Sequence, residues 1–312
     1  MKKISIIIPA YNEEETLDYL FERLTCTING LNKYDFEVLF VNDGSSDNTL
    51  NKIRELRKKD NRISYIDLSR NFGKEIAMIG GLDYATGDAV VFLDADLQDP
   101  PELIGEMLEW WEQGYDDVYA KRKSRAGETL LKKLTASMYY KILGVVSNVP
   151  IQKNTGDFRL LDRRCVEALK KMRESQRYTK GMFSWIGYNK KEILFDRDPR
   201  IAGKTKWNYI KLFDLAIEGI TSFTTKPLRI SSYMGIIISL IAFIYMTFII
   251  ISTIVYKQTV PGYPSLMCVS LFIGGIQLIS LGVMGEYIGR IFNETKDRPL
   301  YFVKEHNEER VL

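Results

Sequence analysis

Short apolar runs alternate with longer helical patterns over about the first 120 residues. Each run is almost continuously apolar, which is typical of a strand buried on both faces of a parallel sheet. The predicted strands are 4–8, 36–41, 63–68, 89–93 and 118–120, and the predicted helices are 13–32, 47–59, 74–85 and 101–113. Asn12, followed by Glu15, is the predicted N-cap of the first helix. This succession predicts an α/β fold with a mostly parallel sheet and ligands at the carboxyl ends of its strands.

Two long charge-free segments, 230–256 and 264–285, stand near the end of the chain. Each is long enough for a helix to cross the hydrocarbon core of a bilayer. The alternative is a pair of helices buried in a soluble core, although such helices are usually shorter and keep a polar stripe. The predicted organisation is a domain over 1–228, two transmembrane helices within 229–290 joined by an external hairpin (257–263), and a tail over 291–312.

Basic residues flank the two segments on one side, whereas the hairpin carries only Lys257. Because Lys and Arg are retained on the cytoplasmic side, we expect a multi-pass plasma-membrane protein with its domain and both termini in the cytoplasm. Met1-Lys2-Lys3 leads straight into a strand-like run, so no cleavable signal is expected. The flanking basic residues are Lys204, Lys206, Lys211, Lys226, Arg229, Arg290, Lys296, Arg298 and Lys304.

Two further stretches, 129–147 and 207–224, are amphipathic at helical spacing. In the first, an apolar stripe runs beside lysines, and in the second a polar stripe interrupts an apolar helix. Such helices can lie in the membrane interface and bring the domain to a lipid. The alternative is that either stripe packs against the soluble domain.

The composition argues against several classes of protein. Of the 312 residues 27% are charged and 46% hydrophobic, and a net charge of +3 does not indicate a nucleic-acid partner. The basic residues gather near the predicted membrane segments, where anionic lipid is the expected partner. No Gly-x-Gly-x-x-Gly follows the first strand and no P-loop motif occurs, which argues against dinucleotide enzymes and P-loop NTPases. Cys26, Cys165 and Cys268 are scattered, which indicates a reducing compartment without a disulfide framework or a zinc site.

Polar residues follow the ends of three predicted strands, at 9–13, 42–47 and 94–96. The last group is Asp94-Ala95-Asp96, whose two carboxylates at i and i+2 on an extended segment point the same way. They could hold one hard divalent cation and leave its other positions to phosphate oxygens. The alternative is a pair of acids that serve solubility or helix capping. Together the three groups favour a nucleotide site built from carboxylates and a metal.

An ordered set of motifs carries a resemblance to a known family. The motifs are Pro9-Ala10-Tyr11-Asn12-Glu13, Asn42-Asp43-Gly44-Ser45-Ser46-Asp47, Arg70-Asn71-Phe72-Gly73-Lys74, Asp94-Ala95-Asp96-Leu97-Gln98-Asp99-Pro100-Pro101-Glu102 and Gly156-Asp157-Phe158-Arg159-Leu160. They closely resemble glycosyltransferase family 2. With the two apolar segments they resemble its bacterial polyprenyl-phosphate members, such as the bactoprenol glucosyltransferases, which are related to dolichol-phosphate mannose synthase.

The resemblance implies a GT-A fold, a UDP-sugar donor and Mg²⁺ or Mn²⁺ as the cofactor. It also implies inverting transfer onto polyprenyl (undecaprenyl) phosphate at the cytoplasmic face, giving a lipid-linked sugar for cell-envelope glycosylation. A homotetramer, a separate flippase and an outer-face transferase are the further partners that it implies. Which sugar is transferred does not follow from the motifs.

Carried over by position, the resemblance assigns the metal to Asp94 and Asp96 and the role of catalytic base to Asp157. The nucleotide-sugar site that it implies consists of Pro9, Tyr11, Glu13, Asn42, Asp43, Asp94 and Gln98. Asn42 departs from the family, in which Asp is common at this position. The contact to base or ribose is therefore open.

The expected reaction needs little help from a general base. A divalent cation at Asp94 and Asp96 would offset the charge that the leaving diphosphate gains. The acceptor is a phosphate monoester whose second pKa of about 6 leaves it largely ionised at neutral pH. Asp157 would therefore orient the acceptor or take a residual proton. The alternative is that Asp157 is a turn residue paired with Arg159.

A lipid phosphate must be held by cations against the repulsion of nearby carboxylates. The stretch 200–207 resembles the family's Arg-x-x-Gly-x-Ser-Lys, with Thr205 in place of Ser. The alternative for this stretch is a solvated basic loop. The candidates for the acceptor phosphate are Arg122, Arg125, Arg200, Lys204 and Lys206.

Two other functions stay open at this point. A processive polysaccharide synthase of the same superfamily would carry Gln-x-x-Arg-Trp and more spans, and the nearest match, Gln176-Arg177-Tyr178-Thr179, lacks that motif. A non-catalytic, membrane-tethered nucleotide-sugar sensor would not need Asp94, Asp96 and Asp157 together. Turnover of a UDP-sugar would distinguish an enzyme from the non-catalytic sensor.

Overall fold

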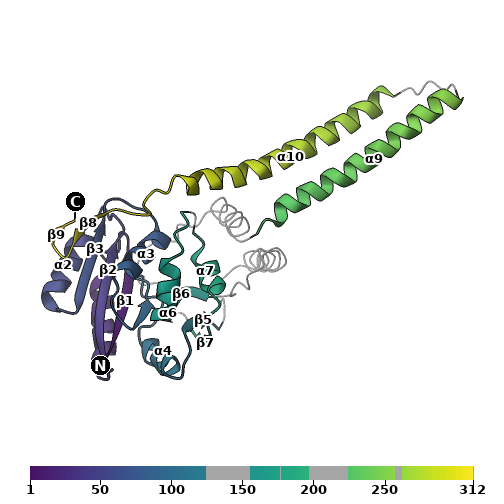
Figure 1. Cartoon of the computed structure of the whole chain (residues 1–312). Coiled ribbons are helices and arrows are strands. Elements are labelled where there is room, and N and C mark those ends of the chain that lie inside the picture. Colours follow the sequence, from purple (N-terminus) through teal and green to yellow (C-terminus); the bar gives the residue numbers. More distant parts are fainter. Residues whose placement is uncertain (124–154, 176, 197–223, 257–261, 312) are drawn as a thin grey trace.

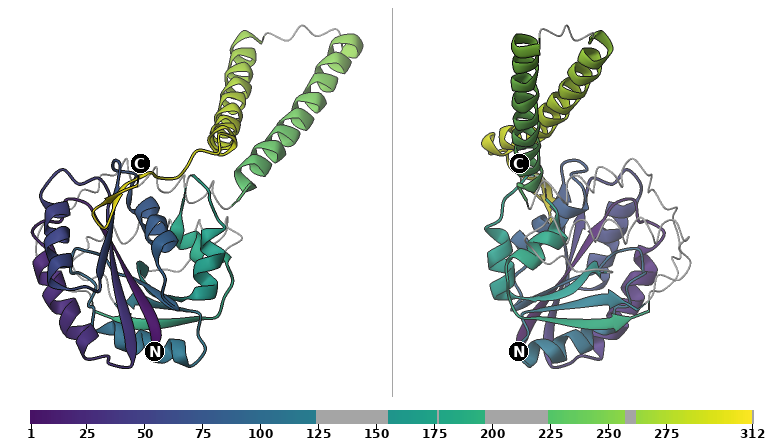
Figure 2. Two further views of the ribbon diagram at one scale, coloured as in Figure 1. Left: turned by 60° about the vertical axis from the view of Figure 1, so that its left-hand side comes forward. Right: turned by 90° about the vertical axis from the view of Figure 1, so that its right-hand side faces the viewer.

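The computed structural model describes residues 1–123, 155–175, 177–196, 224–256 and 262–311. In this part of the chain, one mixed sheet of nine strands has the order β7-β5-β6-β4-β1-β2-β3-β8-β9. A hairpin of two long helices projects from one end of the domain that the sheet forms (Figure 1). In both views of Figure 2 the chain begins at the opposite end, so β1 runs toward the hairpin.

The predicted parallel half of the sheet is confirmed. Its strands are β1 (Lys2–Ala10), β2 (Tyr34–Asn42), β3 (Ile63–Leu68) and β4 (Ala89–Phe92). The connecting helices are α1 (Leu17–Asn29), α2 (Thr49–Lys59) and α3 (Lys74–Tyr84), and α4 (Leu103–Glu112) follows β4. In β1, Ile4, Ile6 and Ile8 pack on one face with α1, α2 and α4, and Ile7 packs on the other face with α3. This burial on both faces explains the continuous apolar runs.

The other half of the sheet mixes directions. The strands and helices are β5 (Asp117–Arg122), β6 (Thr155–Asp162), α6 (Arg163–Lys170), α7 (Thr179–Trp185) and β7 (Lys190–Phe195). Only β5 was predicted from the sequence. β6 lies antiparallel between β4 and β5, and it carries Asp157 into the sheet beside β4, whose last residue, Phe92, stands two positions before Asp94.

The predicted N-cap at Asn12 is wrong. Helix α1 begins at Leu17, with Thr16 in the capping position. Asn12 instead has a positive φ of 55°, and its Oδ1 accepts a hydrogen bond from the Ser46 N–H (2.9 Å). Asn12 therefore joins the loop after β1 to the loop after β2, because an Asn side chain tolerates the left-handed conformation and bonds a nearby backbone.

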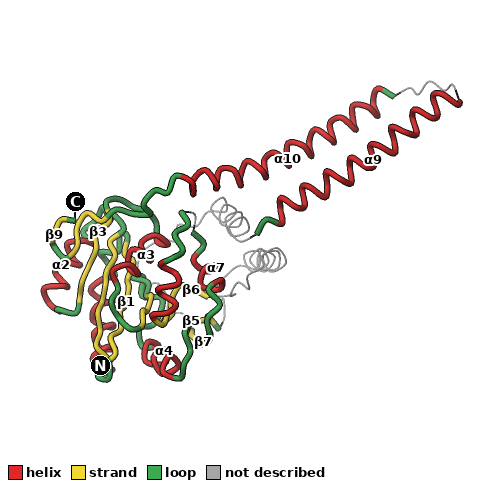
Figure 3. Tube along the Cα trace, viewed as in Figure 1, coloured by secondary structure: helices red, strands yellow, loops and turns green. Residues whose placement is uncertain are grey.

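The two apolar segments form α9 (Lys226–Tyr256) and α10 (Tyr263–Thr295), each a continuous helix (Figure 3). Their candidate membrane spans, Lys226–Ser252 and Leu266–Thr295, have mean hydropathies of 2.7 and 2.1, and neither is buried in the protein. The alternative of two buried core helices is therefore wrong. The helices contact each other where Ser231 Oγ donates to Ser280 Oγ (3.1 Å).

The residues after the hairpin join the domain. β8 (Val303–His306) pairs antiparallel with β3, and β9 (Glu309–Arg310) pairs with β8 at the edge of the sheet. Arg54 on α2 forms an ion pair with Glu305 (2.7 Å), and Tyr301 OH donates to Asp83 on α3 (2.7 Å). A truncation before the hairpin would therefore remove sheet strands as well as the apolar helices.

Candidate active site

A cavity of about 400 Å³ lies at the carboxyl ends of the parallel strands. Its lining comes from the end of β1, from the loops after β1, β2, β3 and β4 and from the start of α3, as expected for an α/β sheet. Six residues predicted for the donor and metal site line it together. They are Pro9, Tyr11, Glu13, Asp43, Asp94 and Asp96, and they are joined there by Ala10, Asn71, Gly73, Lys74, Ala77 and Ala95.

Asp43 fixes the loop that leads into α3. Its two carboxylate oxygens accept hydrogen bonds from the backbone N–H groups of Phe72 (2.7 Å) and Gly73 (2.9 Å). Gly73 has a φ of 96°, a conformation that favours glycine. Burial raises the pKa of the Asp43 carboxyl, and the two backbone hydrogen bonds oppose this shift. Asp43 thus holds Lys74, the next residue, at the mouth of the cavity.

Asp94 and Asp96 are the residues that could hold a metal. Within the described residues no group of three or more His, Cys, Asp or Glu side chains could do so. Two carboxylates on one turn fit Mg²⁺ or Mn²⁺, because Mg²⁺ commonly takes one or two protein carboxylates and completes its shell with water and substrate phosphate. The Gln98 N–H donates to Asp96 Oδ1 (3.2 Å), which shapes the turn.

Lys74 connects this carboxylate pair to Asp157. Its Nζ lies 2.6 and 2.8 Å from the two oxygens of Asp94 and 2.6 Å from Oδ2 of Asp157. Lys74 stands in the motif Arg70-Asn71-Phe72-Gly73-Lys74, and no role is predicted for it from the sequence. The one available signal was its place at the start of a helix, directly after the strand-end loop.

The charges of these groups support each other. Burial disfavours the charged form of Asp157, but Lys74 and Lys180 outweigh it and hold the pKa of the carboxyl well below its usual range. Desolvation of the ammonium by the groups around it also opposes the charge of Lys74, but Asp157 and Asp94 raise the pKa of the ammonium above its usual range. Asp157 is therefore ionised at neutral pH and is a weak proton acceptor.

Arg159 bonds Asp117, and its charge also helps to lower the pKa of Asp157. Its Nη1 donates to both oxygens of Asp117 (3.1 and 3.3 Å), and both side chains are fully buried. The Arg159 guanidinium also lies over the ring of Phe183, 3.8 Å from its centroid. The alternative of a turn residue is wrong, because Asp157 lies in β6, where it bonds Lys74.

Replacing Arg159 by Met should lower the free energy of unfolding by about 3–5 kcal/mol, because Asp117 would stay buried without its guanidinium partner. Lys190 Nζ, 3.7 Å from Asp117, compensates only in part. Urea unfolding of the full chain in detergent, followed by tryptophan fluorescence, measures the change. The double variant with Asp117→Asn should recover part of the loss, and a loss below about 1 kcal/mol for Arg159→Met would contradict the pairing.

Other predicted site residues lie outside the cavity lining or outside the described part of the chain. Asn42 is 1% exposed, and its Nδ2 donates to Asp67 Oδ1 (2.6 Å) beside the cavity. Gln98 is half-buried in the turn after Asp96. Arg122 ends β5, and its Nη2 lies 3.8 Å from where a Cβ on Gly156 would stand, next to Asp157. Arg125, Arg200, Lys204, Lys206 and the two predicted interfacial helices are outside the described residues.

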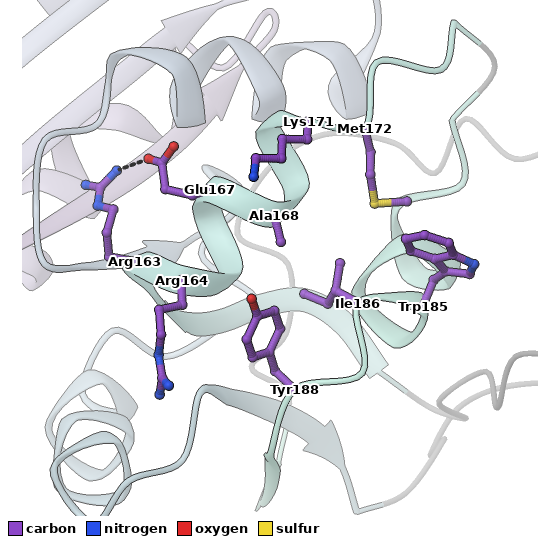
Figure 4. Close-up of a pocket in the computed structure, with 9 residues that line it drawn as sticks. All are labelled: Arg163, Arg164, Glu167, Ala168, Lys171, Met172, Trp185, Ile186 and Tyr188. Carbon is purple, nitrogen blue, oxygen red and sulfur yellow. Dashed lines mark hydrogen bonds and ion pairs between the residues drawn. The ribbon is translucent and has the colours of Figure 1, made fainter.

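A second cavity of about 660 Å³ lies between α6 and α7 (Figure 4). It is lined by Arg163, Arg164, Glu167, Ala168, Lys171, Met172, Trp185, Ile186 and Tyr188. Glu167 is the one carboxylate of this lining, and Arg163 bonds it at 3.4 Å. The lining contains none of the predicted site residues and offers no pair of carboxylates for a metal.

An α/β domain with an acidic strand-end site, followed by two long apolar helices, is the architecture of a membrane-associated GT-A glycosyltransferase. The chain belongs to glycosyl transferase family 2, whose profile matches residues 5–170. The profile of the GtrB C-terminal hairpin matches residues 226–291. The predicted family and fold class are thereby confirmed.

Relatives share nearly the whole chain. An uncharacterized glycosyltransferase, sll0501, of Synechocystis is 52% identical over 97% of this chain and 95% of its own. A bactoprenol glucosyl transferase of Shigella phage SfX is 45% identical over 97% and 99%, and a prophage bactoprenol glucosyl transferase homolog of Escherichia coli is 46% identical over 97% and 98%. Among solved structures, glucosyl-3-phosphoglycerate synthase from Mycobacterium tuberculosis with Mn²⁺, UDP-glucose and phosphoglyceric acid has a TM-score of 0.45 and 18% identity, and the match covers 70% of this chain and 78% of that one.

Proposed function

We propose that the protein moves one sugar from a UDP-sugar to polyprenyl (undecaprenyl) phosphate, with inversion, at the cytoplasmic face of the plasma membrane. The observation that carries this proposal is the cavity that contains Asp43, Asp94 and Asp96 and opens beside Asp157. The acceptor class is supported by relatives of nearly equal length that are named bactoprenol glucosyl transferase. Two candidate membrane spans in the same chain agree with a lipid acceptor.

In the donor half, Pro9, Tyr11, Glu13 and Asp43 take the nucleoside end of UDP. Asp94 and Asp96 would hold Mg²⁺ or Mn²⁺ with the donor diphosphate. A bound divalent cation supplies positive charge where the departing diphosphate gains negative charge. The cavity keeps the diphosphate beside α3. Helix α3 packs closely against β1 because residue 81 is Gly81, where a Cβ would come within 2.3 Å of Ile7.

In the acceptor half, a phosphate oxygen forms the new bond to the anomeric carbon while the bond from that carbon to the diphosphate breaks. The phosphate is already ionised, so little deprotonation is needed. Asp157 accordingly orients the acceptor. Its Oδ2 is held by Lys74, and its Oδ1 is buried without a hydrogen-bond partner among the described residues, so one oxygen is left to face a ligand.

The helical hairpin would place the reaction next to the membrane. β1 runs toward the hairpin, so the carboxyl ends of the parallel strands face the same end of the domain as α9 and α10 (Figure 2). A membrane around the hairpin would then lie on the side of the donor cavity, where a lipid phosphate resides. We include four further features in the proposal. The catalytic domain faces the cytoplasm, the protein forms a homotetramer, and its product passes to a separate flippase and an outer-face transferase.

A panel of UDP-sugars, offered to the full chain with undecaprenyl phosphate in detergent, tests this function. We expect one donor to give a lipid heavier by a single sugar, as measured by mass spectrometry. A ladder of longer products would favour the processive synthase. Binding of UDP-sugars without any lipid product from the whole panel would favour the sensor and contradict the proposal.

A further inference from the structure

Lys74 lies where the metal and acceptor parts of the site meet. Its ammonium is within 2.8 Å of both oxygens of Asp94, and it also bonds Asp157 at 2.6 Å. The geometry points to Lys74 as a resident counter-cation that competes with the divalent metal for Asp94 and keeps Asp157 after the metal displaces it. The inference rests on the proposed function, in which Asp94 is a metal ligand. Lys74 is then a positioning residue of the transfer reaction.

The Lys74 ammonium and a metal ion cannot bind the Asp94 carboxylate at the same position at the same time. Mg²⁺ binds a carboxylate oxygen at about 2.0–2.1 Å, so on either oxygen of Asp94 it would lie next to the ammonium that contacts both. The two cations repel each other at this separation. One of them must therefore leave the shared position when the other binds.

The side chain of Lys74 is free to make this movement, whereas its backbone is not. The side chain is 42% exposed and ends in a flexible four-carbon stem. Its backbone is held by the hydrogen bonds that the neighbouring Phe72 and Gly73 donate to Asp43. Metal binding therefore shifts the ammonium and leaves α3 in place.

The shift has a consequence for the acceptor side. Once Asp94 is taken by the metal, the Lys74 ammonium keeps its hydrogen bond to Asp157. The same contact fixes Oδ2 of Asp157 and leaves the buried Oδ1 for the acceptor. Loading of the donor side thus concentrates the Lys74 charge on Asp157 and links the two halves of the site.

Mn²⁺ binding to the full chain in detergent tests the competition, with free Mn²⁺ followed by electron paramagnetic resonance. We expect Lys74→Met to bind Mn²⁺ about three- to fivefold more tightly than the wild type, the gain expected from removing one partly exposed ion pair. The transfer rate of the same variant should fall. Lys180→Met is the matched control, because Lys180 also acts on Asp157 by its charge, whereas the ion pair with Asp94 is made by Lys74. Its Mn²⁺ affinity should change by less than about twofold.

Unchanged or weaker Mn²⁺ binding by Lys74→Met, or an equal gain in Lys180→Met, would overturn the inference. A second measurement uses the wild type alone: Mn²⁺ should increase acetylation of Lys74 by an amine reagent relative to Lys180, and unchanged labelling would also overturn it. Asp96→Ala separates this result from the proposed function. If that variant binds Mn²⁺ as the wild type does, the metal assignment fails, whereas weak binding by Asp96→Ala with no gain in Lys74→Met defeats only the role of Lys74.

Discussion

Asp94→Ala and Asp96→Ala should each lower the rate of sugar transfer at least about a thousandfold in Mg²⁺ or Mn²⁺ while the protein still folds. The reason is that the leaving diphosphate would lose a cation that contributes several kcal/mol of charge stabilisation, and each 1.36 kcal/mol is a factor of ten in rate. Both carboxylates line the cavity at the strand ends and are partly exposed, so their loss leaves the core intact. Rates are measured on folded protein, checked by circular dichroism.

A surface carboxylate provides the matched control for these two variants. Asp18 on α1 is 52% exposed, pairs with Lys52 and is not part of the cavity lining. Asp18→Ala should keep the wild-type rate, because exposed ion pairs contribute little. Full activity of the wild type in excess chelator would contradict the metal assignment, whatever the two variants do.

Asp157→Asn should lower the transfer rate by about a hundredfold or more and leave the affinity for UDP nearly unchanged. Asp157 bonds Lys74 from β6 and is not part of the donor cavity lining, so its loss affects the acceptor side. Calorimetric titration with UDP and initial rates separate the two effects. A comparable loss of UDP affinity would move Asp157 into the donor site.

The pH dependence distinguishes orientation from proton transfer by Asp157. Its lowered pKa keeps the carboxylate ionised from well below neutral pH upward, so its own titration changes nothing between about pH 6 and 8. The ratio of wild-type to Asp157→Asn rates should therefore be flat in this range. A defect that shrinks as the acceptor phosphate ionises, near pH 6, would instead favour a base.

The parallel half of the fold was predictable because its signals are local. A strand covered by helices on both faces is apolar at most positions, and the predicted 63–68 has the bounds of β3. The mixed half was not predictable in this way. β6 contains the charged Arg159, which is buried only because Asp117 on β5 neutralises it. β8 pairs with β3 across the whole hairpin, and no local pattern reports such a distant partner.

In the candidate site, too, residues with local signals were predictable and residues that depend on distant contacts were not. The carboxylates after β1, β2 and β4 could be placed together from the sequence because carboxyl ends of parallel strands meet at one edge. Lys74 could not be assigned, since a lysine that begins a helix usually faces solvent, and its partner Asp157 lies 83 residues further along the chain. The assignment of Asn42 to the nucleotide stays a prediction, because its burial against Asp67 depends on the pairing of β2 with β3.

The ratio of UDP to glycosylated lipid shows whether the protein transfers a sugar to the lipid phosphate with the help of a metal. The full chain is incubated in detergent with undecaprenyl phosphate, a divalent cation and the UDP-sugar that the donor panel selects, and both UDP and the glycosylated lipid are quantified over time. We predict that they form in equal amounts, that both stop on addition of chelator, and that both resume when Mg²⁺ or Mn²⁺ is restored. Release of UDP without glycosylated lipid, or equal formation of both in excess chelator, would contradict the account.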